Sequence, residues 1–361
     1  MIISGGYTPK VWMFLMLLLN VLLAIYYLLI YKKVLNNRYI KLSTWLYTIC
    51  MLLLSASRPI GKMGFADSQM YTDWFLYAKE HAKPIHYRDI AFDYYQLLLS
   101  YVVNERGFFV VTTLLFVSLL LIIGKKVNRE WYILVIPLFL CTEIYFGIMN
   151  VLLRNGIGML LFILAILSKK HTYKLILFML SVLFHKSMVL PVLVYGILQF
   201  VNIKIRHHLL LWLVAIPVSL IVGNQWYYLL ETIAFDFRFD YLLKLTPDSY
   251  LYYQTGFRWD FLFISAVVII YGLYQIYIRD YKNTFYLLLF KLFISLNTAW
   301  ILFMYANHTV RFFLLSWFLV PVLLGYPYLH TFHKNHQNHF IKLIVVLVSF
   351  SILMYFKRFL F

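Results

Sequence analysis

The sequence predicts an all-α, polytopic membrane protein, a single domain over residues 1–361 that crosses a bilayer about a dozen times. One observation is composition: 63% of the residues are hydrophobic and 13% are charged. A soluble protein carries roughly a quarter charged residues, so this chain needs lipid as its solvent. A second observation is that apolar runs long enough for a span recur between short basic connectors.

Twelve spans are expected from the hydropathy of the chain. The first is expected to be retained because no small-residue cleavage site follows it. The sixth is short, which indicates a kinked or partial crossing. The predicted spans are 11–31, 41–56, 108–124, 131–148, 149–168, 173–185, 187–201, 208–222, 259–278, 284–305, 310–329 and 340–356.

Orientation follows from the connectors after every second span, which are basic. They lie at 32–41, 125–129, 169–174, 204–206, 279–282 and 334–342. Such loops face the cytoplasm, which places both chain termini outside. The net charge of +18 therefore reflects membrane topology and anionic lipid, and no nucleic-acid partner is expected.

Two long connections then become periplasmic loops, at 57–107 and 223–258, and they hold most of the 14 acidic residues. Tyr71, Trp74, Phe75 and Ala78 have helical spacing, which predicts an amphipathic helix on the membrane surface. A second helix is predicted over Phe92–Leu99, dipping into the interface. The Tyr-rich stretch Tyr241–Tyr253 is either an interfacial aromatic belt or a surface on which sugars stack.

Ionisable residues gather at the predicted outer ends of the helices, where a charge is costly and often functional. The set comprises Arg58, Arg154, His185, Lys186, Arg258, Asp260, His308 and Arg311. Each has a structural alternative: a lone arginine can snorkel to headgroups, His185 can cap a hairpin, and Arg258 can pair with Asp260. As a set they suit a polyanionic lipid head such as a diphosphate, which guanidinium groups bind in a bidentate way.

Metal and disulfide chemistry are not expected. Cys50 and Cys141 lie singly inside predicted spans, and no pair has the spacing of a thiolate site. The histidines at 330, 333, 336 and 339 lie in a polar linker without a neighbouring carboxylate or cysteine.

Several short motifs resemble the EpsG/Wzy-type polysaccharide polymerases. Ser57-Arg58, Gly64-Phe65-Ala66-Asp67 and Tyr71 resemble their Arg…Gly-x-Asp…Tyr opening. Phe92–Leu98 occupies the place of their acidic, aromatic and leucine-rich helix, with Asp93 but without a Pro-Gly pair. Leu153-Arg154-Asn155 is similar to their Ile-Arg-Gln segment, Phe184-His185-Lys186-Ser187 to their Phe-His-x-Ser hairpin, and Arg311-Phe312-Phe313 to a late Arg-aromatic element.

The resemblance implies a multi-pass glycosyltransferase of the bacterial inner membrane with a GT-C-like architecture and a site facing the periplasm. It would join undecaprenyl-diphosphate-linked repeat units into O-antigen of lipopolysaccharide or into capsule. The growing glycan moves from its lipid diphosphate to the incoming unit, without a nucleotide sugar, metal or other cofactor. Expected partners are the lipid-linked donor and acceptor, membrane lipid and, by analogy, a chain-length regulator.

Roles follow for the residues of the outer set. Arg154 and Arg311, with Arg58 or Arg258, are expected to hold the diphosphate and stabilise its developing charge. His185 is the leading candidate for the base because an imidazole titrates near neutrality. Asp67 and Asp260 are its substitutes. Other expected contacts to the diphosphate or glycan come from Lys186, His308, Tyr71 and Asp93, with Trp74, Tyr94, Trp226 and Tyr252 stacking on sugars.

Other functions remain open at the level of sequence. A lipid-linked oligosaccharide flippase also has about a dozen spans, although its charges belong near the midplane of the bilayer. A membrane O-acyltransferase would need an acyl donor to reach its active histidine. An O-antigen ligase shares the donor and the fold class with a polymerase. The sequence selects neither the sugars nor the linkage.

Overall fold

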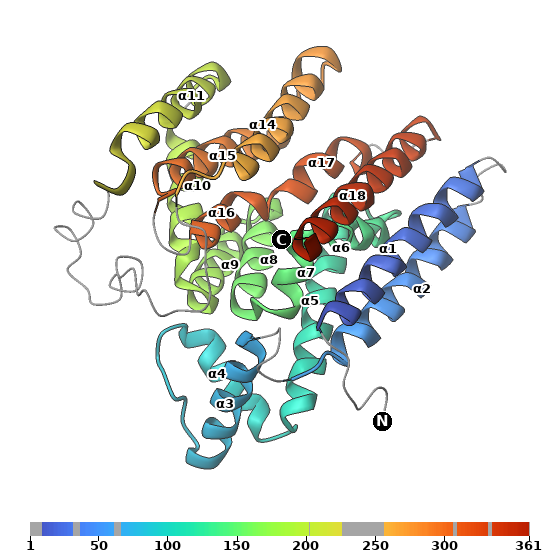
Figure 1. Cartoon of the computed structure of the whole chain (residues 1–361), viewed down its shortest axis with the longest axis vertical. Coiled ribbons are helices and arrows are strands. Elements are labelled where there is room, and N and C mark those ends of the chain that lie inside the picture. The colour runs from blue at the N-terminus through green and yellow to red at the C-terminus, as the bar shows by residue number, and fades with distance from the viewer. Residues whose placement is uncertain are drawn as a thin grey trace. The chain divides into compact units, whose positions relative to one another are not determined.

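The computed structural model describes residues 9–31, 37–60, 66–201, 203–225, 256–305, 309–330 and 334–360. Over these ranges the secondary structure is helical, with no β-strand among them (Figure 1). Contacts divide the chain into two compact units. Unit 1 comprises Met1–Met188 and Gly325–Phe361, and unit 2 comprises Val189–Leu324.

Unit 1 holds both ends of the chain and most of the helices. Its elements are α1 (Pro9–Tyr31), α2 (Asn37–Ala56), α3 (Ala66–His81), α4 (Ile90–Ser100), α5 (Glu105–Val127), the 3₁₀ turn η1 (Tyr132–Leu134), α6 (Val135–Leu140), α7 (Glu143–Asn150), α8 (Leu153–Leu167), α9 (His171–Phe184), the 3₁₀ turn η2 (Lys186–Met188) and α18 (Lys334–Leu360). Helix α1 packs against both α2 and α18.

Unit 2 is formed by the chain from Val189 to Leu324. Its elements are α10 (Val189–Phe200), α11 (Ile205–Val222), the 3₁₀ turn η3 (Gly223–Gln225), α14 (Trp259–Leu273), the π-helical turn η5 (Tyr274–Ile278), α15 (Thr284–Leu302) and α16 (Thr309–Trp317). Helix α17 (Val320–Leu329) contains the boundary between the units. Buried Asn297 on α15 accepts from Trp212 Nε1 and donates to Ser265 and Ser316 hydroxyls. These bonds tie α11, α14, α15 and α16 together with polar contacts, as is common between membrane helices.

Six helical stretches in the described residues are long and apolar enough to cross a membrane. They are Arg38–Ala56, Glu105–Val127, Ile205–Val222, Trp259–Ile278, Thr284–Leu302 and Thr309–Leu329. Shorter apolar helices include Leu153–Leu167, His171–Phe184 and Lys186–Phe200. The prediction of a polytopic helical membrane protein is confirmed, and the number twelve stays a prediction.

The segment 131–148, predicted as one span, is not one continuous helix in the structure, and its crossing of the membrane stays a prediction. The chain forms η1, α6 and α7 there, with a break between Leu140 and Glu143. Thr142 has extended backbone angles, and its hydroxyl donates to the carbonyl oxygen of Phe139 at 2.6 Å. This local bond competes with helix continuation, and hydropathy does not register it.

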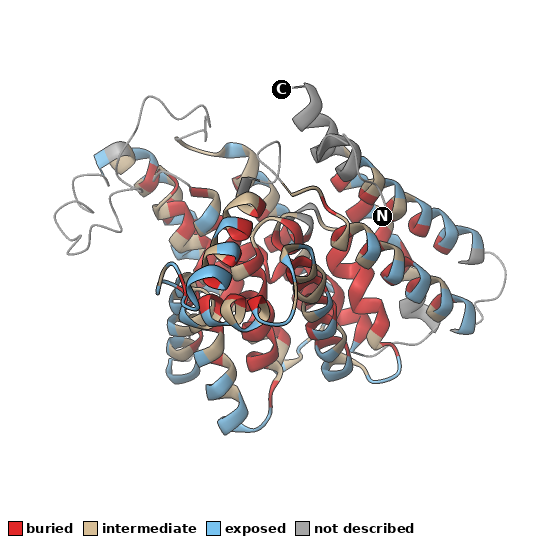
Figure 2. Cartoon of the chain, turned by 90° about the horizontal axis from the view of Figure 1, so that it is seen from below, coloured by how far each residue is buried: buried red, intermediate tan, exposed pale blue. Residues whose placement is uncertain are grey.

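The core of unit 1 lies along α8 and its neighbours. Nearly every side chain of α8 is buried, and Figure 2 shows buried residues concentrated in the interior helices. Helices α5, α7 and α9 pack around α8. By contrast, α1 and α2 each keep one apolar face exposed; Leu42, for example, is 64% exposed. A helix buried on all sides belongs to the core, whereas an exposed apolar face suits lipid.

The two helices predicted in the first long loop are present as α3 and α4. The predicted apolar face of α3 comprises Tyr71, Trp74, Phe75 and Ala78; Trp74 is half-buried, and the other three side chains are fully buried. That face packs against the protein and not against the membrane surface as predicted: Tyr71 meets Phe92 of α4, and Phe75 meets Phe108 of α5, each with ring centroids 5.4 Å apart. The two aromatic side chains on α4 and α5 cover the face that amphipathicity assigned to lipid.

Several predictions lie outside the described residues. They concern most of the 223–258 loop, including Trp226 and Tyr241–Tyr253 with Tyr252, and also His308, the Gly64-Phe65 pair and His333. The side chains of Ala66 and His336 are likewise not described.

Candidate functional site

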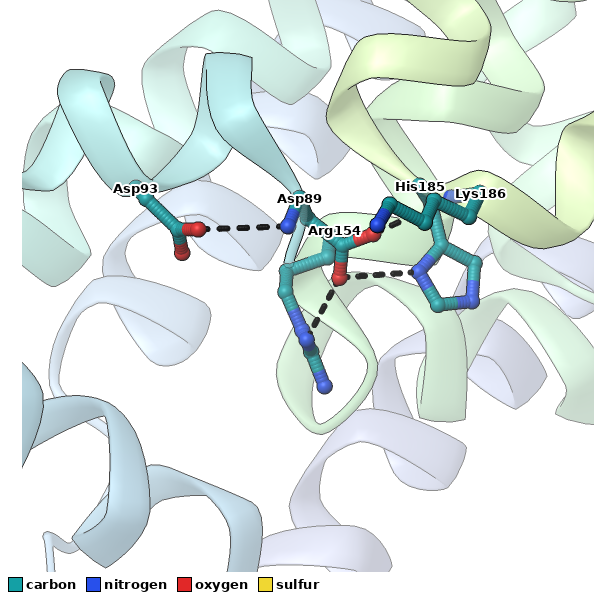
Figure 3. A network of polar contacts seen from close by, with 5 residues as sticks. All are labelled: Asp89, Asp93, Arg154, His185 and Lys186. Atoms are coloured by element: carbon teal, nitrogen blue, oxygen red, sulfur yellow. Dashed lines mark hydrogen bonds and ion pairs between the residues drawn. The ribbon is translucent and has the colours of Figure 1, made fainter. Parts of the chain in front are cut away.

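A buried carboxylate, Asp89, lies at the centre of a polar network in unit 1 (Figure 3). Its Oδ2 accepts from Arg154 Nη1 at 2.5 Å and lies 3.3 Å from His185 Nδ1. Its Oδ1 accepts from the main-chain N–H of Lys186 at 3.0 Å. Asp89 is only 3% exposed, so three donors from two separate segments satisfy a carboxylate that has little access to water.

The position of Asp89 on α4 explains why its carboxylate is available. Asp89 is the N-cap residue of α4, but its side chain makes no capping bond to that helix. An N-cap aspartate usually accepts from an amide of the first turn. Here the Asp93 carboxylate accepts a hydrogen bond from the main-chain N–H of Asp89 at 3.1 Å. The Asp89 carboxylate is therefore free of its own helix and turns toward α8 and α9.

Arg154 reaches this carboxylate from the first turn of α8. A cation at the positive end of a helix is electrostatically disfavoured, and the Asp89 carboxylate compensates for it. The guanidinium also lies 5.1 Å from the Trp74 ring and 6.0 Å from the Tyr71 ring, both on α3. Its buried Nε has no hydrogen-bond partner among the described residues. Asp89 therefore orients a guanidinium that is 18% exposed and has further N–H donors.

His185 is positioned by the end of α9 and by a glycine on α8. Helix α9 ends at Phe184, and His185 has extended backbone angles that turn its ring out of the helix. One turn after Arg154, Gly158 lets α9 approach: an added Cβ would lie 3.0 Å from the Ser181 carbonyl oxygen and 3.5 Å from His185 Cβ. The Ser181 hydroxyl donates to the Gly158 carbonyl at 2.7 Å. This close approach brings His185 to the Arg154 end of α8.

The two carboxyl groups of the network differ in charge state. Burial alone would raise the pKa of Asp89, but the hydrogen bond and charge of His185, the charge of Arg154 and the Lys186 amide together lower it below its usual value. Burial, reinforced by the negative charge of Asp89, raises the pKa of Asp93 to about 6. Asp89 is thus a fixed anion near neutral pH, whereas Asp93 titrates close to it.

Arg58 lies in the interior of unit 1 with its side chain fully buried. Its Nη1 donates to the carbonyl oxygens of Met149 and Asn150 at 3.0 and 3.2 Å, and its Nη2 to that of Phe109 at 3.4 Å. Burial lowers the pKa of Arg58 to about 9, which leaves the guanidinium charged at neutral pH. These bonds satisfy carbonyls at the end of α7, which a helix leaves without internal partners.

The remaining predicted residues lie elsewhere. Asp67 is in the first turn of α3. In unit 2, Arg258 binds Asp260 through two bonds of 2.9 and 2.7 Å, which is the local ion pair foreseen as the structural alternative. Arg311 is exposed in the first turn of α16. The structure brings together Arg154, His185, Lys186 and Asp93 from the predicted set, with Tyr71 beside them.

Comparison with known proteins adds one finding. The profile described as EpsG family matches residues 61–360, which is most of the chain and includes every residue of the network. This chain belongs to the EpsG family. Searches of curated proteins and of solved structures found no significant match. Family membership makes this EpsG chain a membrane protein with a polysaccharide-polymerase-like role.

Asp89 is a residue of the candidate site that sequence reasoning missed. It is one of several acids in the first long loop, and it precedes a predicted helix, where an aspartate is usually a cap. The one sequence signal for Asp89 was an acidic residue three positions before the predicted Phe92–Leu99 helix. Its contacts come from residues more than 60 positions later in the chain, which local pattern does not reveal.

Proposed function

We propose that this EpsG chain polymerises undecaprenyl-diphosphate-linked oligosaccharide repeat units into O-antigen or capsular polysaccharide at the periplasmic face of the bacterial inner membrane. The observation that carries the proposal is the convergence of Arg154 and His185 on Asp89. A permanent cation for a phosphate leaving group and an imidazole for an attacking hydroxyl are the two groups that this transfer requires.

Arg154 is assigned to the donor diphosphate. Its guanidinium is planar and always charged, and it presents several N–H donors that match phosphate oxygens. One nitrogen bonds Asp89, so the group is oriented before substrate arrives, and its Nε is a donor without a partner among the described residues. Preorganised donors of this kind stabilise charge that grows in the transition state. Arg311 belongs to unit 2, and its assignment to phosphate binding rests on the sequence pattern alone.

His185 is assigned to the acceptor hydroxyl as the general base. With Nδ1 directed at the Asp89 carboxylate, the proton belongs on Nδ1 and the basic lone pair on Nε2. The acceptor hydroxyl transfers its proton to Nε2 as its oxygen bonds to the anomeric carbon of the donor glycan. The bond from that carbon to the diphosphate oxygen breaks, and the electron pair leaves on the lipid diphosphate beside Arg154. One displacement of this kind inverts the anomeric centre.

Trp74 is assigned to the sugar nearest the diphosphate. Its ring is half-buried beside the Arg154 guanidinium and meets the His86 ring edge to face at 5.4 Å. An aromatic face offers apolar surface for the C–H face of a sugar ring. The donor is already activated by its diphosphate, so the proposed transfer runs without a nucleotide sugar or a divalent metal.

The direct test uses purified protein in detergent with one defined undecaprenyl-diphosphate-linked repeat unit and EDTA. The proposal predicts a ladder of lipid-linked oligomers, with one undecaprenyl diphosphate released for each bond formed. A well-folded protein that gives no ladder on its cognate repeat unit overturns the proposal and favours the flippase or the acyltransferase. A ladder that requires added metal overturns the metal-independent mechanism.

A further inference from the structure

We propose that Asp89 is the positioning residue of this site, holding the proton of His185 on Nδ1 and the guanidinium of Arg154 in place. The inference rests on the proposed function and deepens it, since it names the group that makes a base and a phosphate ligand act together. Asp89 itself does not contact the reacting atoms.

The geometry assigns a separate task to each carboxylate oxygen. Oδ2 receives the two functional side chains, Arg154 at 2.5 Å and His185 at 3.3 Å. Oδ1 receives the main-chain N–H of Lys186, directly after His185 in the chain. Asp89 therefore holds both the His185 ring and the backbone that carries it. A rotation of the carboxylate would disturb all three contacts at once.

A structural role in capping α4 does not account for this arrangement. The Asp89 side chain makes no capping bond to α4, although an aspartate at this position usually caps its own helix. The bond at this end of the helix comes instead from Asp93. The Asp89 carboxylate points away from its own helix. It bonds groups of α8 and of the α9–η2 turn instead.

Asp89 determines which nitrogen of the His185 imidazole carries the proton. A carboxylate that accepts from Nδ1 fixes the tautomer, which directs the Nε2 lone pair at a proton donor. When Nε2 takes the acceptor proton, the resulting imidazolium lies beside an anion that already compensates Arg154. The Asp89 carboxylate lies 3.3 Å from Nδ1 of this ring, and Arg154 bonds the same carboxylate oxygen.

A positioning role and a substrate-binding role of Asp89 predict different effects on kcat and on the donor KM. The negative charge of Asp89 opposes a diphosphate, whereas its bond to Arg154 holds a diphosphate ligand in place, so the two effects on donor affinity offset each other. Removing that charge without loss of shape, as in Asp89→Asn, is expected to leave the KM for the donor unchanged or lower. The same change is expected to reduce kcat by about 10- to 100-fold, the range seen when a group that orients a ligand or base is lost. A smaller folded fraction would also lower the apparent kcat at unchanged KM, so kcat is expressed per folded protein, with the folded fraction measured by thermal unfolding.

The first experiment measures the tautomer of His185 and needs no polymerase activity. Full-length protein labelled with ¹⁵N-histidine is reconstituted in phospholipid vesicles, and the ring nitrogens are recorded by NMR at neutral pH. The signal that disappears in His185→Gln belongs to His185. The expected wild-type signal has its proton on Nδ1, and Asp89→Asn is expected to lose that preference. An unchanged His185 tautomer in folded Asp89→Asn overturns the inference.

The second experiment measures kcat and the donor KM for Asp89→Asn, Asp89→Glu and the matched control Asp73→Asn. Asp73 is an exposed acid on α3 whose side chain bonds Gln69, so its loss is expected to leave both constants unchanged. Asp89→Glu keeps the charge and is expected to recover part of kcat. A wild-type kcat in Asp89→Asn overturns the positioning role, as does a loss of kcat together with a large rise in KM. If wild type forms no polymer, the proposed function fails while the tautomer still reports on Asp89.

Discussion

Two arginines that sequence analysis placed in one diphosphate-binding set have different surroundings. Both have a buried Nε without a partner among the described residues, but Arg154 is 18% exposed and lies beside Asp89 and Trp74. Arg58 is fully buried, and its terminal nitrogens bond main-chain carbonyls on α5 and α7. The physical difference is solvation: a guanidinium that already satisfies carbonyls in the interior has its charge committed to the fold.

Arg58→Met is expected to destabilise the protein by about 3 kcal/mol, because buried carbonyls lose charged hydrogen-bond donors. Thermal unfolding in detergent measures this loss as a lower Tm. The folded fraction is expected to polymerise within about threefold of the wild-type rate, since most substitutions outside a site act on stability. A wild-type Tm with abolished polymerisation would return Arg58 to the substrate site that the sequence predicts.

Asp93 makes the stability of the folded protein depend on pH. Its pKa is about 6 in the folded chain against an ordinary value of 3.8, so between these values the folded state binds more protons than the unfolded state. Stability from this group therefore increases as pH falls from 7 toward 5. Thermal unfolding at pH 7 and pH 5 is expected to show a smaller gain for Asp93→Asn than for wild type. An equal gain in both proteins contradicts the assignment. Asp89, whose pKa is lowered, stays ionised across this window.

At the scale of elements, the site depends on how closely α8 and α9 approach. Gly158→Ala places a Cβ 3.0 Å from the Ser181 carbonyl oxygen and 3.3 Å from Met188 Cγ, so the end of α9 must shift by a few tenths of an ångström. We expect Gly158→Ala to lower polymerisation by about tenfold, because small displacements of positioned groups are costly in catalysis.

The matched control for this helix contact is Gly196→Ala on α10, where an added Cβ meets nothing within 4 Å. It is expected to keep the wild-type rate, with equal or higher Tm, because alanine favours a helix over glycine. Initial rates and Tm of the two variants are compared directly. Equal activity of both variants would show that the approach of α8 to α9 does not set the position of His185.

Elements with strong periodicity were predictable, and those decided by a single side chain were not. Helices α3 and α4 follow from apolar spacing around Tyr71 and Phe92, and the His185 turn follows from its short motif. The break at Thr142 was missed because one hydroxyl bond ends the helix inside an apolar run. The face of α3 was assigned to lipid because amphipathicity does not distinguish a membrane from a neighbouring helix; here Phe92 and Phe108 cover it.

The same limit applies to the site. Arg154 and His185 were predicted from residue type and position near helix ends, and both reach one carboxylate. Asp89 was not predicted, because its importance arises from contacts with residues distant in sequence. Arg258 illustrates the opposite case: its partner Asp260 is two residues away, so the ion pair was visible as an alternative in the sequence.

At the scale of the whole molecule, the account requires the Asp89 site to face the periplasm. In a Cys50→Ala, Cys141→Ala background, Asp73→Cys on α3 is expected to react with a membrane-impermeant maleimide in spheroplasts. Lys126→Cys, at the basic end of α5, is expected to react only after permeabilisation. Both native side chains are exposed. The reverse labelling pattern contradicts the orientation derived from the basic connectors.

The initial rate of dimer formation tests the proposal that this EpsG chain forms glycosidic bonds at Arg154. Purified wild type, Arg154→Ala and the exposed-arginine control Arg129→Ala receive the same lipid-linked repeat unit in EDTA. The account predicts equal rates for wild type and Arg129→Ala, and a loss of at least about 100-fold for Arg154→Ala. A folded Arg154→Ala protein that forms dimer at the wild-type rate would contradict the account.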